Sequence, residues 1–265
     1  MSANNDSIQK TLTVAVLLCL VCAIIVAGAA VSLKPMQIAN KAEDKKKNVL
    51  AAAGMLEPGV SVEDQFKKIT TRIVNLEEGR FATDAELQEI RAAGLDPDNY
   101  DQRKASSMPE LSKALSGDED PASIKRLEKY AAVYMIQNEG EIEKIILPIH
   151  GYGLWSTLYG FVALKGDMDT IVGLGFYSHA ETPGLGGEVD NPKWKSIWEG
   201  KEVFDDSGDV AIKVVKGPAE QGNPYQVDGL SGATLTSRGV SELVRFWVGD
   251  RAFGGLLTKL KEQGA

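Results

Sequence analysis

Asp228-Gly-Leu-Ser-Gly-Ala-Thr234, followed directly by Leu235-Thr236-Ser237, is the stretch of this chain that decides how its C-terminal half is interpreted. The residues are small, and an amphipathic pattern begins immediately behind them. Glycine and alanine let a backbone approach a phosphate closely, and a helix N-terminus offers unpaired N–H groups and a positive dipole end. Ser, Gly and Thr are also ordinary helix-capping residues. The stretch is therefore either a phosphate cradle with Thr234 at the phosphate, or a helix cap.

The surrounding sequence predicts an α+β domain with an antiparallel sheet over residues 130–265. A helix is expected from about Ser237 to Val248, because apolar residues recur there at i, i+3, i+4 and i+7. Strand-like runs precede it, with turn residues between them, and a short helix is expected at 192–199. The expected strands are 131–136, 142–149, 158–164, 170–177 and 210–215.

Residues 34–129 are expected to form a mostly helical, hydrophilic region. Ser61-Val-Glu-Asp64 resembles a capping box and predicts a helix through about Leu76. Thr83-Asp-Ala-Glu86 is a second such pattern, with Gly94 as the expected helix end. Residues 96–122 are rich in Asp, Pro and Ser and are expected to form a loop.

The N-terminus carries a candidate membrane span. A short tail, residues 1–10, precedes 23 residues without a charged side chain, 11–33, which is long enough to cross a bilayer core. Ala27-Gly28-Ala29 would also suit a signal peptidase. The apolar stretch is long for a signal peptide and its leading segment is weakly basic, so we favour a retained single-pass helix. More lysines follow the span than precede it, which alone would place the domain in the cytoplasm.

Composition excludes some classes of function. The net charge of −8 and the lack of a basic stripe argue against nucleic acid as a partner. The two cysteines, Cys19 and Cys22, both lie in the apolar segment without nearby His or acidic residues, so a zinc site there is not expected. The Walker and dinucleotide-binding patterns are absent. We expect neither a metal site nor a complete catalytic site on this chain.

Three further glycine-containing clusters accompany the Thr234 loop. They are His150-Gly-Tyr-Gly-Leu-Trp-Ser156, His179-Ala-Glu-Thr-Pro-Gly-Leu-Gly-Gly187 and Val214-Val-Lys-Gly217, each at the end of an expected strand. Singly, each is an ordinary turn or strand end. The first two and Asp-x-x-Ser-Gly-Ala-Thr, in this order, resemble the FMN-binding domain family shared by NqrC, of the Na+-translocating NADH:quinone reductase (Nqr), and RnfG, of the related Rnf complex. The resemblance covers about residues 130–250.

The resemblance implies a flavin bound covalently. In that family a separate flavin transferase joins FMN to the final Thr of the motif through a phosphoester bond, and this residue is Thr234 here. The expected phosphate contacts are Ser231, Gly232, Ala233 and Thr236. Trp155 and Leu185 are suited to cover the isoalloxazine ring.

The other expected site residues lie on the neighbouring loops. Glu181 and Thr182, with Gly186 in the same loop, are expected at the polar edge of the ring or at the ribityl chain. Lys216 would place a cation near N1, where reduced flavin gathers negative charge. Asp228 is expected to be read by the transferase, or to position a metal during flavin transfer. His150 and His179 are expected to make structural hydrogen bonds.

The resemblance further implies a role in electron transfer. A chain of the Nqr type would relay electrons inside an inner-membrane translocase that couples NADH oxidation by ubiquinone to Na+ export, beside its neighbours NqrB, NqrD and NqrE. The flavin domain would face the periplasm, against the lysine pattern, and the Na+ path would lie on other chains of the complex. A chain of the RnfG type is the nearest alternative. A membrane-anchored binding module without redox activity is the alternative of a different class.

Overall fold

The computed structural model describes residues 7–264, whose contacts divide the chain into two units, Met1–Asp44 and Lys45–Ala265. One helix, α1 (Ile8–Ala52), begins in the first unit and ends in the second. The sequence predicts a span at 11–33 followed by a hydrophilic region from residue 34, but one helix runs from the span through Pro35 into that region. Of the expected tail 1–10, residues 1–6 lie outside the described residues.

The first unit contains a candidate membrane span. An 18-residue window of α1 has a mean hydropathy of 3.1, and none of that window is buried inside the protein. Among the described residues, α1 is the one helix long and apolar enough to cross a bilayer. Its last turns, by contrast, are buried in the second unit, where Val49 and Leu50 are fully covered.

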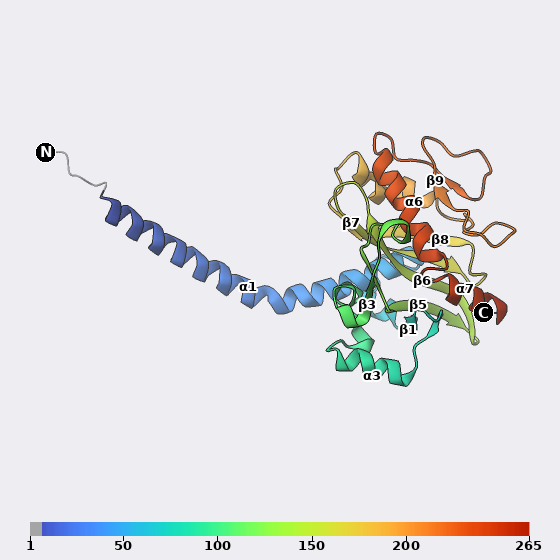
Figure 1. Cartoon of the computed structure of the whole chain (residues 1–265), viewed down its shortest axis with the longest axis horizontal. Coiled ribbons are helices and arrows are strands. Elements are labelled where there is room, and N and C mark those ends of the chain that lie inside the picture. Colours follow the sequence, from blue (N-terminus) through green and yellow to red (C-terminus); the bar gives the residue numbers. More distant parts are fainter. Residues whose placement is uncertain (1–6, 265) are drawn as a thin grey trace. The chain divides into compact units, whose positions relative to one another are not determined.

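The second unit is built on one six-stranded antiparallel sheet of order β2-β1-β5-β6-β7-β8 (Figure 1). Its strands are β1 (Thr70–Asn75), β2 (Arg80–Phe81), β5 (Tyr130–Asn138), β6 (Glu141–Tyr152), β7 (Thr157–Lys165) and β8 (Ile171–Ser178). Smaller pairs are β3 (Ser112–Ala114) with β4 (Arg126–Glu128) and β9 (Lys213–Val214) with β10 (Gln226–Val227). The helices are α2 (Val62–Phe66), α3 (Asp84–Ala92), α4 (Gln102–Ser106), α5 (Pro192–Ser196), α6 (Thr234–Val248) and α7 (Gly254–Glu262). Short 3₁₀ turns include η4 (Gly186–Asp190).

Both faces of the sheet are covered. On β5, Ala131, Val133 and Met135 belong to the core shared with α6 and α7, whereas Ala132 and Tyr134 belong to the core shared with the end of α1, α3 and α4. Successive side chains of a strand point to opposite faces. A strand buried on both faces therefore reads as an uninterrupted apolar run, as β5 does.

Of the five strands expected from residue 131 onward, the first four are confirmed as β5 to β8, and the α+β class is confirmed as well. Glu139 and Gly140 have φ of 53° and 96° and connect Asn138 to its partner Glu141. Positive φ at both central residues is the signature of the tight hairpin turn that matches strand twist. Helix α6 begins at Thr234, earlier than expected, and the strand expected at 210–215 is reduced to the two residues of β9.

The segment before residue 130 differs from its prediction. The helix expected from Ser61 to Leu76 stops at Phe66, and Thr70–Asn75 is strand β1, paired with β5. Ser61 makes no capping hydrogen bond, and β1 is rich in β-branched residues, which favour strands. Residues 34–129 are thus not a separate helical region, since β1 and β2 extend the main sheet. The capping box at Thr83 is confirmed.

Candidate functional site

Thr234 opens helix α6 and is exposed to solvent. Gly232, two residues earlier, has φ of 72°, a conformation that suits glycine. A Cβ at this position would lie 3.0 Å from Leu185 Cδ2, so the Thr234 loop lies against the loop that follows β8. Ser231 is exposed, and Ala233 is buried just before the helix. An exposed hydroxyl thus stands at the positive end of a 15-residue helix.

Glu181 joins three loops. One carboxylate oxygen, Oε1, accepts hydrogen bonds from the backbone N–H groups of Leu154, Trp155 and Ser156, at 3.1, 2.9 and 3.1 Å. The other, Oε2, accepts from the Thr236 hydroxyl at 2.8 Å. Burial alone would raise the pKa of Glu181, but these hydrogen bonds outweigh burial and lower it. Glu181 is therefore a buried, ionised group.

Two glycines make room for this carboxylate. A Cβ at Gly153 would lie 2.7 Å from Glu181 Oε1. A Cβ at Gly186 would lie 2.7 Å from Glu181 Oε2 and 2.6 Å from the Thr236 hydroxyl oxygen. Real Cβ atoms do not approach so closely, so the position of the Glu181 carboxylate requires glycine at 153 and at 186.

This geometry changes two of the expected roles. Thr236 is fully buried, and its hydroxyl donates to Glu181, so it does not face a phosphate beside Thr234. Glu181 is 5% exposed and both of its oxygens accept hydrogen bonds within the protein, so its observed partners are the loops of the site themselves. The sequence indicates both residues, but it predicts that they contact the ligand. Their partners within the protein lie far away in the sequence, and no local pattern reveals such contacts.

The loop after β8 contains the expected tight turn. The carbonyl of Thr182 accepts from the N–H groups of Leu185 and Gly187, at 3.1 and 2.9 Å, and Gly184 has φ of 75°. Pro183 followed by a glycine with positive φ is the pattern of a type II turn. Thr182 and Leu185 are both exposed on this turn, where they are accessible to a ligand.

The two histidines are structural within this fold. His179 Nδ1 accepts from the Glu181 N–H at 3.2 Å, and its Nε2 lies 2.8 Å from Asp190 Oδ2. His150 packs between Tyr159 and Trp247, with ring centroids 5.4 and 4.9 Å away. Burial, with a smaller contribution from Arg103, lowers the pKa of His150 to about 4.

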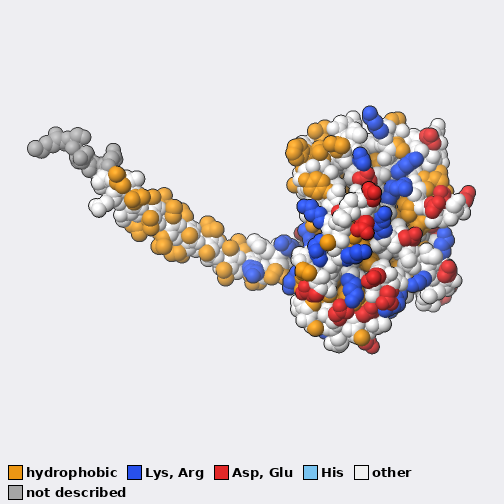
Figure 2. Space-filling view, in the orientation of Figure 1, with side chains coloured by type: hydrophobic (Ala, Val, Ile, Leu, Met, Phe, Trp, Pro, Cys, Tyr) orange, Lys and Arg blue, Asp and Glu red, His pale blue; other side chains and the backbone are white. Residues whose placement is uncertain are grey.

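Large apolar side chains are exposed around these loops. Trp155 is 66% exposed, Leu235 57% and Leu185 44%. Figure 2 shows hydrophobic side chains gathered on the folded unit near the loop before β7 and the start of α6. Exposed apolar groups concentrated at one site are typical of a ligand- or partner-binding surface.

Asp228 and Lys216 lie on adjoining segments. Asp228 Oδ1 accepts from the Ala219 N–H at 2.7 Å, and its backbone carbonyl accepts from the Trp194 indole at 2.9 Å. Gly229 donates to the carbonyl of Gly217, which places the Lys216 segment beside the start of the motif. Lys216 itself is exposed. Within residues 7–264, no group of three metal-ligating side chains comes together.

Sequence reasoning misses two supporting hydroxyls. Ser156 Oγ accepts from the Ala180 N–H at 2.7 Å, which ties the loop before β7 to the loop after β8. Ser237 Oγ accepts from the Leu230 N–H at 2.9 Å inside the Thr234 loop. The Ser237 bond is the one with a local signal, because Ser at a helix start commonly bonds nearby backbone.

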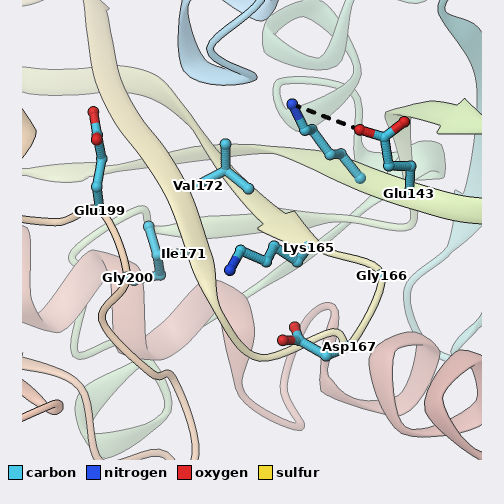
Figure 3. A pocket seen from close by; sticks show the side chains of 9 residues that line it. Glu143, Lys165, Gly166, Asp167, Ile171, Val172, Glu199 and Gly200 are labelled. Atoms are coloured by element: carbon cyan, nitrogen blue, oxygen red, sulfur yellow. Dashed lines mark ion pairs between the residues drawn. The ribbon is translucent and has the colours of Figure 1, made fainter.

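A separate cavity lies at the opposite end of β6 and β7 (Figure 3). Its lining carries both charges: Lys144 Nζ lies 3.9 Å from Glu143 Oε1, and Lys165 and Asp167 line the cavity as well. Lys144 also donates to the carbonyl of Ala53. None of the motif loops contributes to this cavity, so we do not assign it to the site.

Known proteins resemble both the site and the whole chain. The model of the FMN-binding domain family matches residues 153–249, which include the motif loops from Gly153 onward. NqrC of Pseudomonas aeruginosa, a chain of its Na(+)-translocating NADH-quinone reductase, is 50% identical, covering 98% of each chain. NqrC of Vibrio campbellii is 46% identical over 100% of this chain and 99% of its own.

A solved structure shares the fold. The crystal structure of NqrC from Shewanella oneidensis matches with a TM-score of 0.74 and 36% identity, over 84% of this chain and 99% of that chain. The corresponding chain of the Na(+)-translocating NADH-quinone reductase from Parabacteroides distasonis matches with a TM-score of 0.64 and 27% identity, over 85% and 97%. The expected fold, with an antiparallel sheet and an FMN-binding domain, is thus confirmed.

Proposed function

The chain belongs to the NqrC family of the Na+-translocating NADH-quinone reductases, and from this premise we propose that Thr234 carries FMN through a phosphoester bond to its hydroxyl oxygen. The observation that supports this assignment is the exposed Thr234 at the N-terminus of α6, directly after the positive-φ Gly232. The helix end stabilises a phosphate by its dipole and free N–H groups. Ser231, Gly232 and Ala233 supply the adjoining loop.

The ring of the flavin has an apolar surface available to it. Trp155 and Leu185 are exposed on two loops that meet the Thr234 loop, and they cover the isoalloxazine ring by stacking and apolar contact. Thr182 supplies a hydroxyl at the polar edge or the ribityl chain, and Lys216 a cation near N1. Gly186 keeps the ligand loop close to α6. Asp228 shapes the segment before the motif and is read by the flavin transferase.

We propose that the protein is an electron carrier within the reductase complex. Bound FMN supplies reversible uptake and release of electrons. A covalent tether keeps the cofactor at high effective concentration even when its ring is partly exposed. The electrons pass between redox centres of neighbouring chains, NqrB, NqrD and NqrE in particular, while the complex couples NADH oxidation by ubiquinone to Na+ export.

The location proposed is the bacterial inner membrane, with α1 as a single span and the flavin domain in the periplasm. The hydropathy and exposure of α1 support the span. A reporter enzyme active only in the periplasm, fused after residue 264, tests the orientation. Activity of a reporter that works only in the cytoplasm would overturn it.

The covalent bond is tested on the full-length chain produced together with a flavin transferase. After denaturing electrophoresis, the wild-type band should fluoresce as a flavin, and the Thr234→Ala band should be dark. Thr258→Ala removes an exposed threonine hydroxyl from α7, outside the motif loops, and should leave the fluorescence in place. A dark wild-type band in the presence of active transferase would favour a binding module without flavin.

A further inference from the structure

The loops of the site meet at one buried carboxylate, and we infer that Glu181 is a positioning residue that fixes Trp155 relative to Thr234 and keeps a negative charge beside the flavin without touching it. The position of the loops follows from contacts within the protein. The consequence for the flavin rests on the function proposed above.

The first argument concerns the Trp155 loop. Three consecutive N–H groups, those of Leu154, Trp155 and Ser156, converge on Glu181 Oε1. Successive amides that point to one anion form a backbone concavity of the kind that binds anions. The Trp155 side chain is 66% exposed, so packing within the protein does not hold it. The backbone position of Trp155 is therefore set by the carboxylate of Glu181.

The second argument concerns the link to the flavin-bearing helix. Thr236 lies one residue beyond Leu235 in the first turn of α6, and its hydroxyl donates to Glu181 Oε2 at 2.8 Å. Glu181 thus connects the backbone of Trp155 to the turn that begins with Thr234. Gly153 and Gly186 keep space open on either side of the carboxylate.

The third argument concerns charge. Hydrogen bonds to a charged acceptor contribute about 1.5–3 kcal/mol, roughly twice as much as those between neutral groups. A fixed negative charge in a buried position also disfavours the addition of electrons to a neighbouring flavin. Glutamine has nearly the same shape as glutamate and can still accept from the three N–H groups. Glu181→Gln therefore removes the charge while largely keeping the geometry.

The experiment uses the full-length chain produced with a flavin transferase, and measures amide hydrogen exchange at residues 154–156 and the flavin midpoint potential. Glu181→Ala should raise exchange at these amides about tenfold or more, since this corresponds to the loss of about 1.4 kcal/mol. Glu181→Gln should raise exchange clearly less than Glu181→Ala does, because it keeps neutral hydrogen bonds of roughly half the strength, and it should raise the midpoint potential. Glu143→Gln removes a glutamate at the opposite end of β6 and should change neither quantity.

Unchanged exchange in Glu181→Ala would overturn the inference, and so would an unchanged potential in Glu181→Gln. If Glu181→Ala does not fold, Thr236→Val replaces it: exchange should rise in Thr236→Val and return to the wild-type rate in Thr236→Ser. The exchange measurement is repeated in the Thr234→Ala background, which carries no flavin under the proposed function. Failure of the covalent assignment is seen by gel fluorescence, whereas the exchange result judges Glu181 independently.

Discussion

Glu128, at the end of β4, is the buried acid whose replacement has the most distinctive predicted effect. It is 1% exposed, its Oε1 accepts from Gln102, and Oε2 and the nearby Tyr100 hydroxyl have no hydrogen-bond partner among the described residues. Burial raises the pKa of Glu128 to about 8 from its ordinary 4.5, against small opposing contributions from hydrogen bonds. The folded protein therefore holds a proton at Glu128 at neutral pH that the unfolded chain has released.

The sign of the effect on stability follows from proton binding. Because its pKa is higher in the folded than in the unfolded state, Glu128 contributes to the stability of the folded protein. This contribution is fully present below pH 4.5 and is lost as the pH rises toward 8. At 1.36 kcal/mol per pH unit, the loss at pH 7 is about 3 kcal/mol. Glu128→Gln cannot ionise, so its stability relative to wild type should improve by about this amount between pH 4.5 and pH 7.

His150 has the opposite dependence. Its Nδ1 lies 4.0 Å from Glu128 Oε1, and burial lowers its pKa to about 4 from the ordinary 6.5. Its contribution is complete above pH 6.5 and is lost as the pH falls toward 4. Between about pH 4.5 and 6.5 the two groups change the free energy of unfolding in opposite directions, and their effects cancel. The loss of stability caused by Glu128 should therefore be visible on its own from pH 6.5 to 8.

The full chain is unfolded with guanidinium in detergent at several pH values, and unfolding is followed by the fluorescence of the buried Trp198 and Trp247. This measures the difference in free energy of unfolding between wild type and Glu128→Gln. The two proteins share all other titratable groups, so the contributions of those groups to the pH dependence of stability cancel in the difference. Glu143→Gln, on the exposed end of β6, should differ from wild type by a constant amount. A constant difference for Glu128→Gln would refute the reasoning, because it would mean that Glu128 is ionised in the folded protein.

Three other substitutions test the packing of the same unit. Gly186→Ala introduces a Cβ at 2.6 Å from the Thr236 hydroxyl oxygen. It should therefore lower the free energy of unfolding, measured with guanidinium, by about 1–3 kcal/mol. Wild-type stability would contradict the placement of Glu181. Thr83→Ala removes the capping box of α3 and should lower the free energy of unfolding, measured by thermal denaturation, by about 1 kcal/mol. Ser207→Ala, which removes an exposed hydroxyl, is the control and should stay near wild type. Trp247→Phe removes the indole donor to the His150 carbonyl, 2.6 Å away. It should lower the free energy of unfolding by about 1–3 kcal/mol and speed amide exchange in the last residues of strand β6. Unchanged exchange would argue against that hydrogen bond.

The part of the fold that sequence predicts well is the part with strong local signals. Strands β5 to β8 are apolar runs separated by turn residues, and α6 has a clear apolar stripe. Strand β1 escapes prediction because a capping-like Ser61 precedes it, although its β-branched residues favour a strand. Pairing with β5 across more than 50 intervening residues decides its conformation, and no short pattern expresses such a contact.

In the site, too, the features with local sequence signals are predicted and those set by distant contacts are not. The order of the motif loops indicates the family and the acceptor residue, since glycines and hydroxyls at fixed spacing are visible in the sequence. The roles of Glu181 and Thr236 differ from those expected, because their partners are backbone amides and a carboxylate 25 to 55 residues away. The burial of Glu128 is not predicted for a similar reason, because it depends on the packing of α4 and β6 around this residue.

The turn at Glu139–Gly140 offers a practical position from which to observe this domain. Asn138 ends β5 and Glu141 begins β6; both are exposed and lie at the end of these strands opposite the motif loops. The native cysteines, Cys19 and Cys22, both lie in α1, outside the sheet-bearing unit. After their replacement by alanine, Glu141→Cys would accept a spin label or dye far from the flavin. Distances from that label to a second label on a neighbouring chain would then show whether the domain moves when it exchanges electrons.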